Sequence, residues 1–141
     1  MLGMLDRVSE DIKTAMKSKD KETLDAVRML KARLIENKTS PKPQEEMEVV
    51  IAHVKKIKDS LELFPDTSEQ KTKLLREIEI LQIYMPEQLD EAKVKGLITS
   101  IVEEHRDGIN LGVVMRHLTP QIKGKFDGKR ASELVKEALG S

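Results

Sequence analysis

The residues with the clearest chemical potential lie near the C-terminus, where two glycines are interspersed with four cationic side chains. This segment is Ile122-Lys-Gly-Lys-Phe-Asp-Gly-Lys-Arg130. Glycine allows backbone N–H groups to come close to a ligand, and the lysines and Arg130 carry full positive charges. A helical pattern follows the segment, and the N-terminus of a helix adds a partial positive charge. The combination favours an anion, for which a phosphate backbone is the best match.

A purely structural interpretation of the same segment is also open. Gly124 can supply the positive φ that ends a helix, and Asp127 can cap the helix that follows. Asp127 also places a negative charge where a phosphate would bind. The sequence leaves both interpretations standing. The candidates for RNA contact are Arg116, Lys123, Gly124, Lys125, Gly128, Lys129 and Arg130.

A second, weaker basic cluster lies in the middle of the chain. Lys55 and Lys58 are one helical turn apart and could face the same ligand. Because Asp59 and Glu62 follow closely, a solvated helix face is the better interpretation. Lys55 and Lys58 are therefore secondary candidates for binding.

Other kinds of chemistry have little support. The histidines His53, His105 and His117 lack the spacing of a helical zinc site, and the chain has no cysteine. No nucleophile elbow, Walker loop or dinucleotide fingerprint is present. We therefore expect no catalytic residue, no metal site and no cofactor.

The elements that must position these residues all have helical periodicity. One helix is predicted at roughly 3–18, and the next begins after Asp20. A third carries the apolar stripe Met47, Val50, Ile51, Val54, Ile57 and Leu61. A fourth follows a cap at Asp66 or Ser68. The third and fourth helices should each run about 19 residues, or about 28 Å, and form a long hairpin.

The C-terminal part predicts three further helices, with Asp90, Asn110 and Asp127 as caps. Because no segment alternates in the manner of a strand, the expected fold class is all-α. We expect a four-helix N-terminal domain at 1–85 and a three-helix C-terminal domain at 90–141. Pro86 interrupts the pattern between them, so residues 86–89 are interpreted as a linker.

Composition limits the classes of partner. The 141 residues carry 25 basic and 25 acidic side chains, yet residues 105–141 carry 7 basic and 4 acidic ones. The charge therefore points to the C-terminal end. The aromatic residues Phe64, Tyr84 and Phe126 are too few for stacking of single-stranded bases.

The sequence predicts no contact with a membrane. No apolar run approaches the ~18 residues that a membrane-spanning helix needs. The start, Met1-Leu-Gly-Met-Leu-Asp6, lacks the basic and then apolar form of a signal peptide. We expect a cytoplasmic protein, with a mitochondrial relative whose leader is missing as the alternative.

Four stretches of the chain carry a family resemblance. They are Val27-Arg-Met-Leu-Lys-Ala32, Lys58-Asp-Ser-Leu-Glu-Leu-Phe64, Tyr84-Met-Pro-Glu-Gln-Leu89, and Gly112-Val-Val-Met-Arg-His-Leu-Thr-Pro120 leading into Lys123-Gly-Lys-Phe-Asp-Gly128. Together they span nearly the whole chain and resemble the GatB/YqeY-like family, specifically its free-standing YqeY type. The last two stretches, in this order, are the most specific.

The resemblance implies that the C-terminal domain is similar to the tail of GatB, a subunit of the tRNA-dependent amidotransferase. That enzyme amidates misacylated Glu-tRNA or Asp-tRNA with glutamine as donor and ATP, and its tail helps to hold the tRNA. Lys123, Gly124, Lys125 and Gly128 would then be the contact residues. Phe126 departs from the small residue often found there in relatives. We expect it to plug the helix junction rather than to offer a stacking ring.

The chain has no match to the catalytic part of GatB or to the serine–lysine machinery of the amidase subunit. We therefore expect a tRNA-binding accessory protein of the amidotransferase system that is not catalytic by itself. The alternative is a helical protein–protein interaction module, with a partner or a second copy bound through the N-terminal hairpin. A carbon–nitrogen ligase with glutamine as amido donor, which the resemblance would suggest, has the least support.

Overall fold

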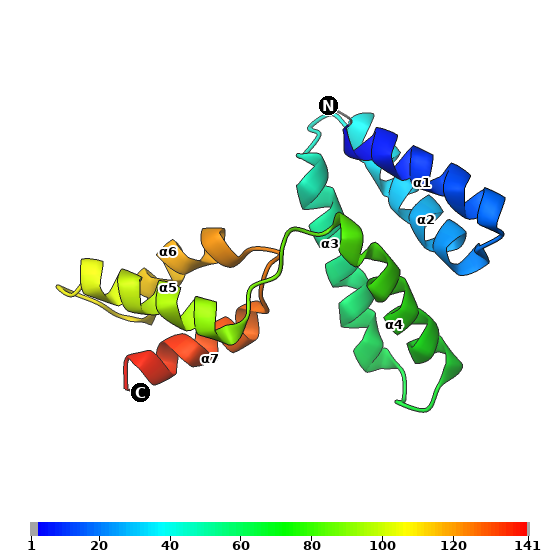
Figure 1. Ribbon diagram of the computed structural model, residues 1–141. Coiled ribbons are helices and arrows are strands. Elements are labelled where there is room, and N and C mark those ends of the chain that lie inside the picture. The colour runs from blue at the N-terminus through cyan, green and yellow to red at the C-terminus, as the bar shows by residue number, and fades with distance from the viewer. Residues whose placement is uncertain (1–2, 141) are drawn as a thin grey trace. The chain divides into compact units, whose positions relative to one another are not determined.

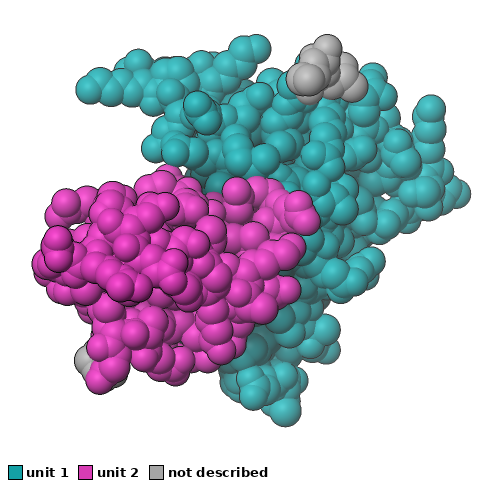
Figure 2. All heavy atoms as spheres, turned by 60° about the vertical axis from the view of Figure 1, so that its left-hand side comes forward, with its two compact units in different colours: residues 1–85 teal, residues 86–141 magenta. Residues whose placement is uncertain are grey.

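A computed structural model describes residues 3–140 of the protein (Figure 1). Within these residues the chain forms seven α-helices and two 3₁₀ turns, with no strand, which confirms the all-α fold class. The chain divides into two compact units, residues 1–85 and residues 86–141 (Figure 2). The segment 86–89, which the sequence suggests as a linker, is part of the second unit.

The first unit packs four helices around a shared apolar core. Its helices are α1 (Met4–Ser18), α2 (Lys21–Lys38), α3 (Glu46–Ser60) and α4 (Glu69–Leu81). Helix α2 is central, because it contacts each of the other three. The buried core consists of Val8, Ala26, Val27, Leu30, Leu34, Val50, Val54, Ile57, Leu81 and Tyr84. On α2 and α3 these residues recur at three- and four-residue spacing, and partly buried residues such as Ile12 on α1 and Ile78 on α4 continue the apolar faces of the other two helices.

Helices α3 and α4 are shorter than the predicted 19 residues, at 15 and 13 residues. Each is followed by a 3₁₀ turn, η1 (Leu61–Leu63) or η2 (Gln82–Tyr84). Phe64 and Met85 then adopt extended backbone conformations immediately before a proline. Because proline disfavours the helical conformation of the preceding residue, both helices end early.

The end of the first unit is fixed by contacts to α1. The buried Tyr84 donates its hydroxyl hydrogen bond to the carboxylate of Asp11. The guanidinium of Arg7 lies over the Tyr84 ring, 4.8 Å from the centroid, and donates to the Ile83 carbonyl at 2.6 Å. Burial and the Asp11 carboxylate raise the pKa of Tyr84. These contacts hold the last residues of the first unit against α1.

The second unit consists of α5 (Glu91–Glu104), α6 (Leu111–Ile122) and α7 (Gly128–Ala138), each in contact with the other two. Its core is separate from that of the first unit. It comprises Val94, Ile98, Ile101, Val114, Leu118, Ile122, Ala131, Leu134 and Val135. Phe126 packs against this core, as expected of a residue that plugs the helix junction.

Side-chain caps confirm most of the predicted helix starts. Asp20 accepts from the Thr23 backbone N–H at 3.2 Å, and Asp90 from that of Lys93 at 2.8 Å. Of the two candidates before α4, Ser68 is the cap, with its hydroxyl accepting from the Lys71 N–H at 3.2 Å. These hydrogen bonds satisfy N–H groups that have no partner inside the helix. Asn110 caps α6 by accepting from the Val113 N–H at 2.9 Å, and Asp127, the cap of α7, lies in the loop that forms the candidate site.

Candidate nucleic-acid interface

The loop between α6 and α7 turns on a glycine with a left-handed backbone. Helix α6 ends at Ile122, and Gly124 has φ of 74°. The backbone N–H groups of Lys125 and Phe126 both donate to the Ile122 carbonyl, at 2.8 and 3.1 Å. A residue with a Cβ is strained at such a φ. The structural interpretation of Gly124 is therefore confirmed, and the turn holds Lys123 and Lys125 on either side of it.

The segment 86–89 is hydrogen-bonded to this loop, and we call this set of contacts the clasp. The Gln88 side-chain amide donates to the carbonyls of Pro86 and Gly124, both at 2.8 Å. The Leu89 backbone N–H donates to the Lys125 carbonyl at 2.8 Å, and its side chain packs against the core. Two of the stretches that carry the family resemblance are thus joined by direct hydrogen bonds. Sequence reasoning missed this clasp, although Gln88 and Leu89 lie within a stretch it had singled out.

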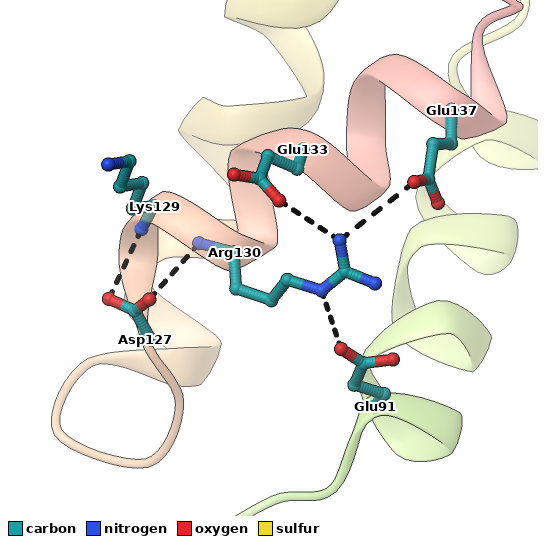
Figure 3. A network of polar contacts seen from close by, with 6 residues as sticks. All are labelled: Glu91, Asp127, Lys129, Arg130, Glu133 and Glu137. Carbon is teal, nitrogen blue, oxygen red and sulfur yellow. Dashed lines mark hydrogen bonds and ion pairs between the residues drawn. The ribbon is translucent and has the colours of Figure 1, made fainter.

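The N-terminus of α7 is already occupied by a carboxylate. Asp127 accepts from the backbone N–H groups of Lys129 and Arg130, at 3.4 and 3.3 Å (Figure 3). The cap satisfies the orphan N–H groups that would otherwise attract an anion. A phosphate at this loop would therefore meet lysine side chains and not the end of the helix.

Arg130 is surrounded by carboxylates of its own unit. Its guanidinium contacts Glu91 at 2.5 Å, Glu133 at 3.0 Å and Glu137 at 3.9 Å (Figure 3). The hydrogen bond to Glu91 is the main cause that raises the pKa of Arg130, and the same bond lowers the pKa of Glu91. Three negative charges around one positive charge repel a phosphate. Of the seven predicted contact residues, Arg130 has the least support.

The other predicted residues are more accessible. Lys123 and Lys129 are exposed, Lys125 is half-buried, and Arg116 is exposed on α6. In Figure 3 the Lys129 side chain points away from the carboxylates around Arg130. Arg116 precedes Lys123 by seven residues, which is two turns or about 10 Å along the helix. The loop and the adjoining helices thus present several cations near one another in the chain.

Gly128 has a different conformation from Gly124. It is the first residue of α7, and a Cβ built on it would have no atom within 4 Å. The space beside its backbone is therefore open to a ligand. The secondary candidates Lys55 and Lys58 are exposed on α3, in the first unit.

Two histidines of the second unit form a pair that the sequence did not reveal. The rings of His105 and His117 stack, with centroids 4.1 Å apart and planes within 10°. They come from the end of α5 and from α6, so no local spacing signalled the contact. Among residues 3–140 no group of three or more His, Cys, Asp or Glu side chains gathers as metal ligands would.

Comparison with known proteins fixes the family. The family model described as "Yqey-like protein" matches residues 5–139, which is nearly the whole chain. The chain belongs to the YqeY-like family. Membership covers both units, so the α6–α7 loop and the clasp at 86–89 lie inside the region that matches the YqeY-like model.

A relative supports the same assignment. "Altered inheritance of mitochondria protein 41, mitochondrial" from Pyrenophora tritici-repentis (strain Pt-1C-BFP) is 26% identical over 148 residues. The match covers 98% of this YqeY-like chain and 82% of the relative. The name places that relative in mitochondria. Within residues 3–140 of the present chain, no helix has the length and apolar character to cross a membrane.

Proposed function

We propose that this YqeY-like protein binds the phosphate backbone of tRNA through Lys123, Lys125 and Lys129, with Arg116 as a further contact. The observation that carries the proposal is the clasped loop between α6 and α7. Hydrogen bonds from Gln88 and Leu89 hold the backbone of this loop, so Lys123 and Lys125 lie on a turn of fixed path on either side of Gly124. A fixed backbone reduces the entropy lost when the loop meets a ligand.

The mode of binding in this proposal is recognition of shape and charge. Phe126 packs against the core of its unit and is not presented for base stacking. Folded RNA is commonly recognised through phosphates and shape when no aromatic platform is present. Asp127 limits the strength of such a site because its carboxylate lies among the lysines. The proposal therefore predicts modest affinity that depends strongly on salt.

A titration of tRNA at two salt concentrations tests the proposal. The variant Lys123→Gln with Lys125→Gln should weaken binding about tenfold at low salt, and should reduce the salt slope by about one for each lost phosphate contact. The matched control is Lys93→Gln with Lys95→Gln, which removes two exposed lysines from α5 of the same unit. Binding that is absent at low salt, or equal in the two double variants, contradicts the proposal.

We further propose that the chain acts as an accessory of the tRNA-dependent amidotransferase and performs no chemistry alone. The support is the resemblance of the second unit to the GatB tail. Misacylated tRNA incubated with ATP, glutamine and the pure chain should yield no amidated product. Addition of the chain to a complete amidotransferase should change the KM for tRNA more than kcat, because the chain would affect binding. Product formed by the chain alone would overturn this assignment.

A groove in the first unit favours a second candidate function, that of a protein–protein interaction module. The groove has a volume of about 660 Å³ and lies between α2 and α4. Met29, 53% exposed, and Ile80 supply its apolar surface, and burial raises the pKa of Glu77 beside them. An amphipathic helix would suit such a groove. A monomer at all concentrations in sedimentation, unchanged by Met29→Lys, would argue against a second copy as the occupant.

The compartment we propose is the cytoplasm, as the sequence suggests. The mitochondrial name of the relative supplies the competing assignment. Fluorescence imaging of the full-length gene product in its own cells separates the two, with diffuse signal expected in the first case.

A further inference from the structure

A second, unrelated pocket lies in the first unit, between the C-terminal part of α2, the loop after it and α3. Its volume is about 370 Å³. Arg33, Lys42 and Lys56 contribute positive charge to its lining, and Glu36 contributes the opposing carboxylate. Volumes of this size are typical of small-molecule sites. The lining therefore carries an excess of two positive charges with His53 neutral.

Hydrogen bonds hold the loop that forms one wall of this pocket. The Asn37 side-chain amide donates to the Gln44 carbonyl at 2.9 Å and accepts from the Gln44 N–H at 2.8 Å. This pair of hydrogen bonds ties the loop to the last turns of α2. Lys42 therefore sits on a loop of fixed path beside the pocket.

His53 is the second observation that points to a ligand. Its side chain lines the pocket and is only 8% exposed, and its Nε2 atom has no hydrogen-bond partner among residues 3–140. A buried polar atom without a partner costs free energy, and such atoms are rare. Burial first, and then the charges of Arg33 and Lys56, lower the pKa of His53. An anion in the pocket would offset the positive charges of Arg33 and Lys56. It would thereby favour the protonated, positively charged form of His53.

We propose that this pocket binds a small molecule through a phosphate monoester group. Arg33 and Lys56 supply charge-assisted hydrogen bonds to the phosphate oxygens, Lys42 adds charge at the rim, and His53 takes up a proton as the ligand enters. The contact between Arg33 and Glu36, at 3.5 Å, is an exposed ion pair. Such pairs are weak, so Arg33 remains able to turn to a ligand. The proposal rests on the first unit and is independent of tRNA binding by the second.

Calorimetric titration of the full chain with inorganic phosphate and with adenosine 5′-monophosphate tests the site, with adenosine as the uncharged control. We expect both phosphates to bind and adenosine not to bind. Arg33→Gln and Lys56→Gln should each weaken phosphate binding about tenfold. The matched control is Lys55→Gln, which removes the same charge from the next residue of α3, outside the pocket. Glu36→Gln should tighten binding, because it removes the opposing carboxylate.

A pH series with sulfate isolates His53, because histidine changes its charge within about pH 5–8 whereas sulfate, the anion of a strong acid, does not. Arg33 and Glu36 on α2, Lys42 on the loop and Lys56 on α3 line the pocket together with His53. Sulfate affinity should fall as the pH rises, and His53→Gln should flatten that dependence. Dimethyl phosphate, a diester with the charge of an RNA linkage, should bind more weakly than phosphate. The proposal fails if phosphate does not bind, if Lys55→Gln and Lys56→Gln are equivalent, or if the diester binds as well as the monoester.

Discussion

At the scale of single residues, the two glycines of the α6–α7 loop differ in conformation and therefore in function. Gly124 has a left-handed backbone, whereas Gly128 is helical with open space beside it. Gly124→Ala should lower the free energy of unfolding by about 1 kcal/mol through backbone strain. Gly128→Ala should not destabilise the fold, because alanine is the better helix former. Thermal melts followed by circular dichroism measure both effects.

The same pair of variants tests whether RNA approaches the backbone at Gly128. If a phosphate lies against that backbone, the added methyl of Gly128→Ala should weaken tRNA binding while leaving stability intact. Equal tRNA affinity of Gly128→Ala and the parent chain would remove Gly128 from the contact set. It would leave the lysine side chains as the source of binding.

His53 predicts a pH dependence of stability in the first unit. Its pKa in the folded chain lies below the ordinary 6.5, mainly because of burial. The unfolded chain therefore takes up a proton before the folded chain does. Stability should be full above about pH 7 and should fall as the pH is lowered through 6.5 toward the depressed pKa. Melts in a buffer without phosphate or sulfate should show this loss.

The single tyrosine of the chain makes this measurement specific to one unit. Tyr84 is buried in the first unit, so its fluorescence follows the unfolding of that unit. In His53→Gln the pH dependence between 5 and 7 should shrink, because the titrating group is gone. If the stability of His53→Gln depends on pH as strongly as that of the parent chain, other groups cause the pH dependence.

At the scale of elements, the α7 cap combines a structural benefit with an electrostatic cost to RNA binding. Asp127 satisfies two N–H groups, and its carboxylate lies between Lys125 and Lys129 in the sequence of the loop. Asp127→Asn should preserve stability, because asparagine caps about as well as aspartate, and should raise tRNA affinity about two- to fivefold. Asp127→Ala should lose about 1 kcal/mol of stability. Filter binding and thermal melts together separate the two effects, and unchanged tRNA affinity in Asp127→Asn would place the RNA elsewhere.

Helix starts and inward faces were predictable because both depend on residues close in sequence. A cap such as Asp20 or Asp90 acts on an N–H group three residues later, and the apolar stripes repeat within one helix. Helices α3 and α4 end earlier than the sequence predicts. The apolar pattern continues through η1 and η2, whereas each proline favours an extended conformation of the residue before it, Phe64 or Met85. Local patterns therefore predicted the elements well and their ends less well.

The candidate site was less predictable because its decisive contacts join distant residues. Arg130 meets Glu91 from 39 positions away, and Gln88 reaches Gly124 across 36. Glu133 and Glu137 follow Arg130 by three and seven residues on α7 itself, but the local sequence offers Glu133 to Lys129 as well, four residues away. The contact with Glu91 depends on the packing of α5 against α7, and it identifies Arg130 as the cation that is already engaged.

At the scale of the whole molecule, the two units have separate cores, and this makes the boundary between them testable. The buried clusters of residues 1–85 and 86–141 share no residue. A fragment of residues 86–141 should therefore fold alone and keep its helical circular dichroism. A unit this small is only marginally stable, so its stability should respond clearly to the loss of a few contacts.

The clasp predicts that the boundary lies at residue 86 and not at residue 90. A fragment of residues 90–141 lacks the Gln88 and Leu89 hydrogen bonds and the packing of the Leu89 side chain. Their loss should cost about 2 kcal/mol, which lowers the Tm of so small a unit by roughly 10 °C. Gln88→Ala in the longer fragment removes the side-chain bonds alone and should give an intermediate Tm. Equal Tm values for the two fragments would show that residues 86–89 are a linker after all, because a segment that holds the loop cannot be removed without cost.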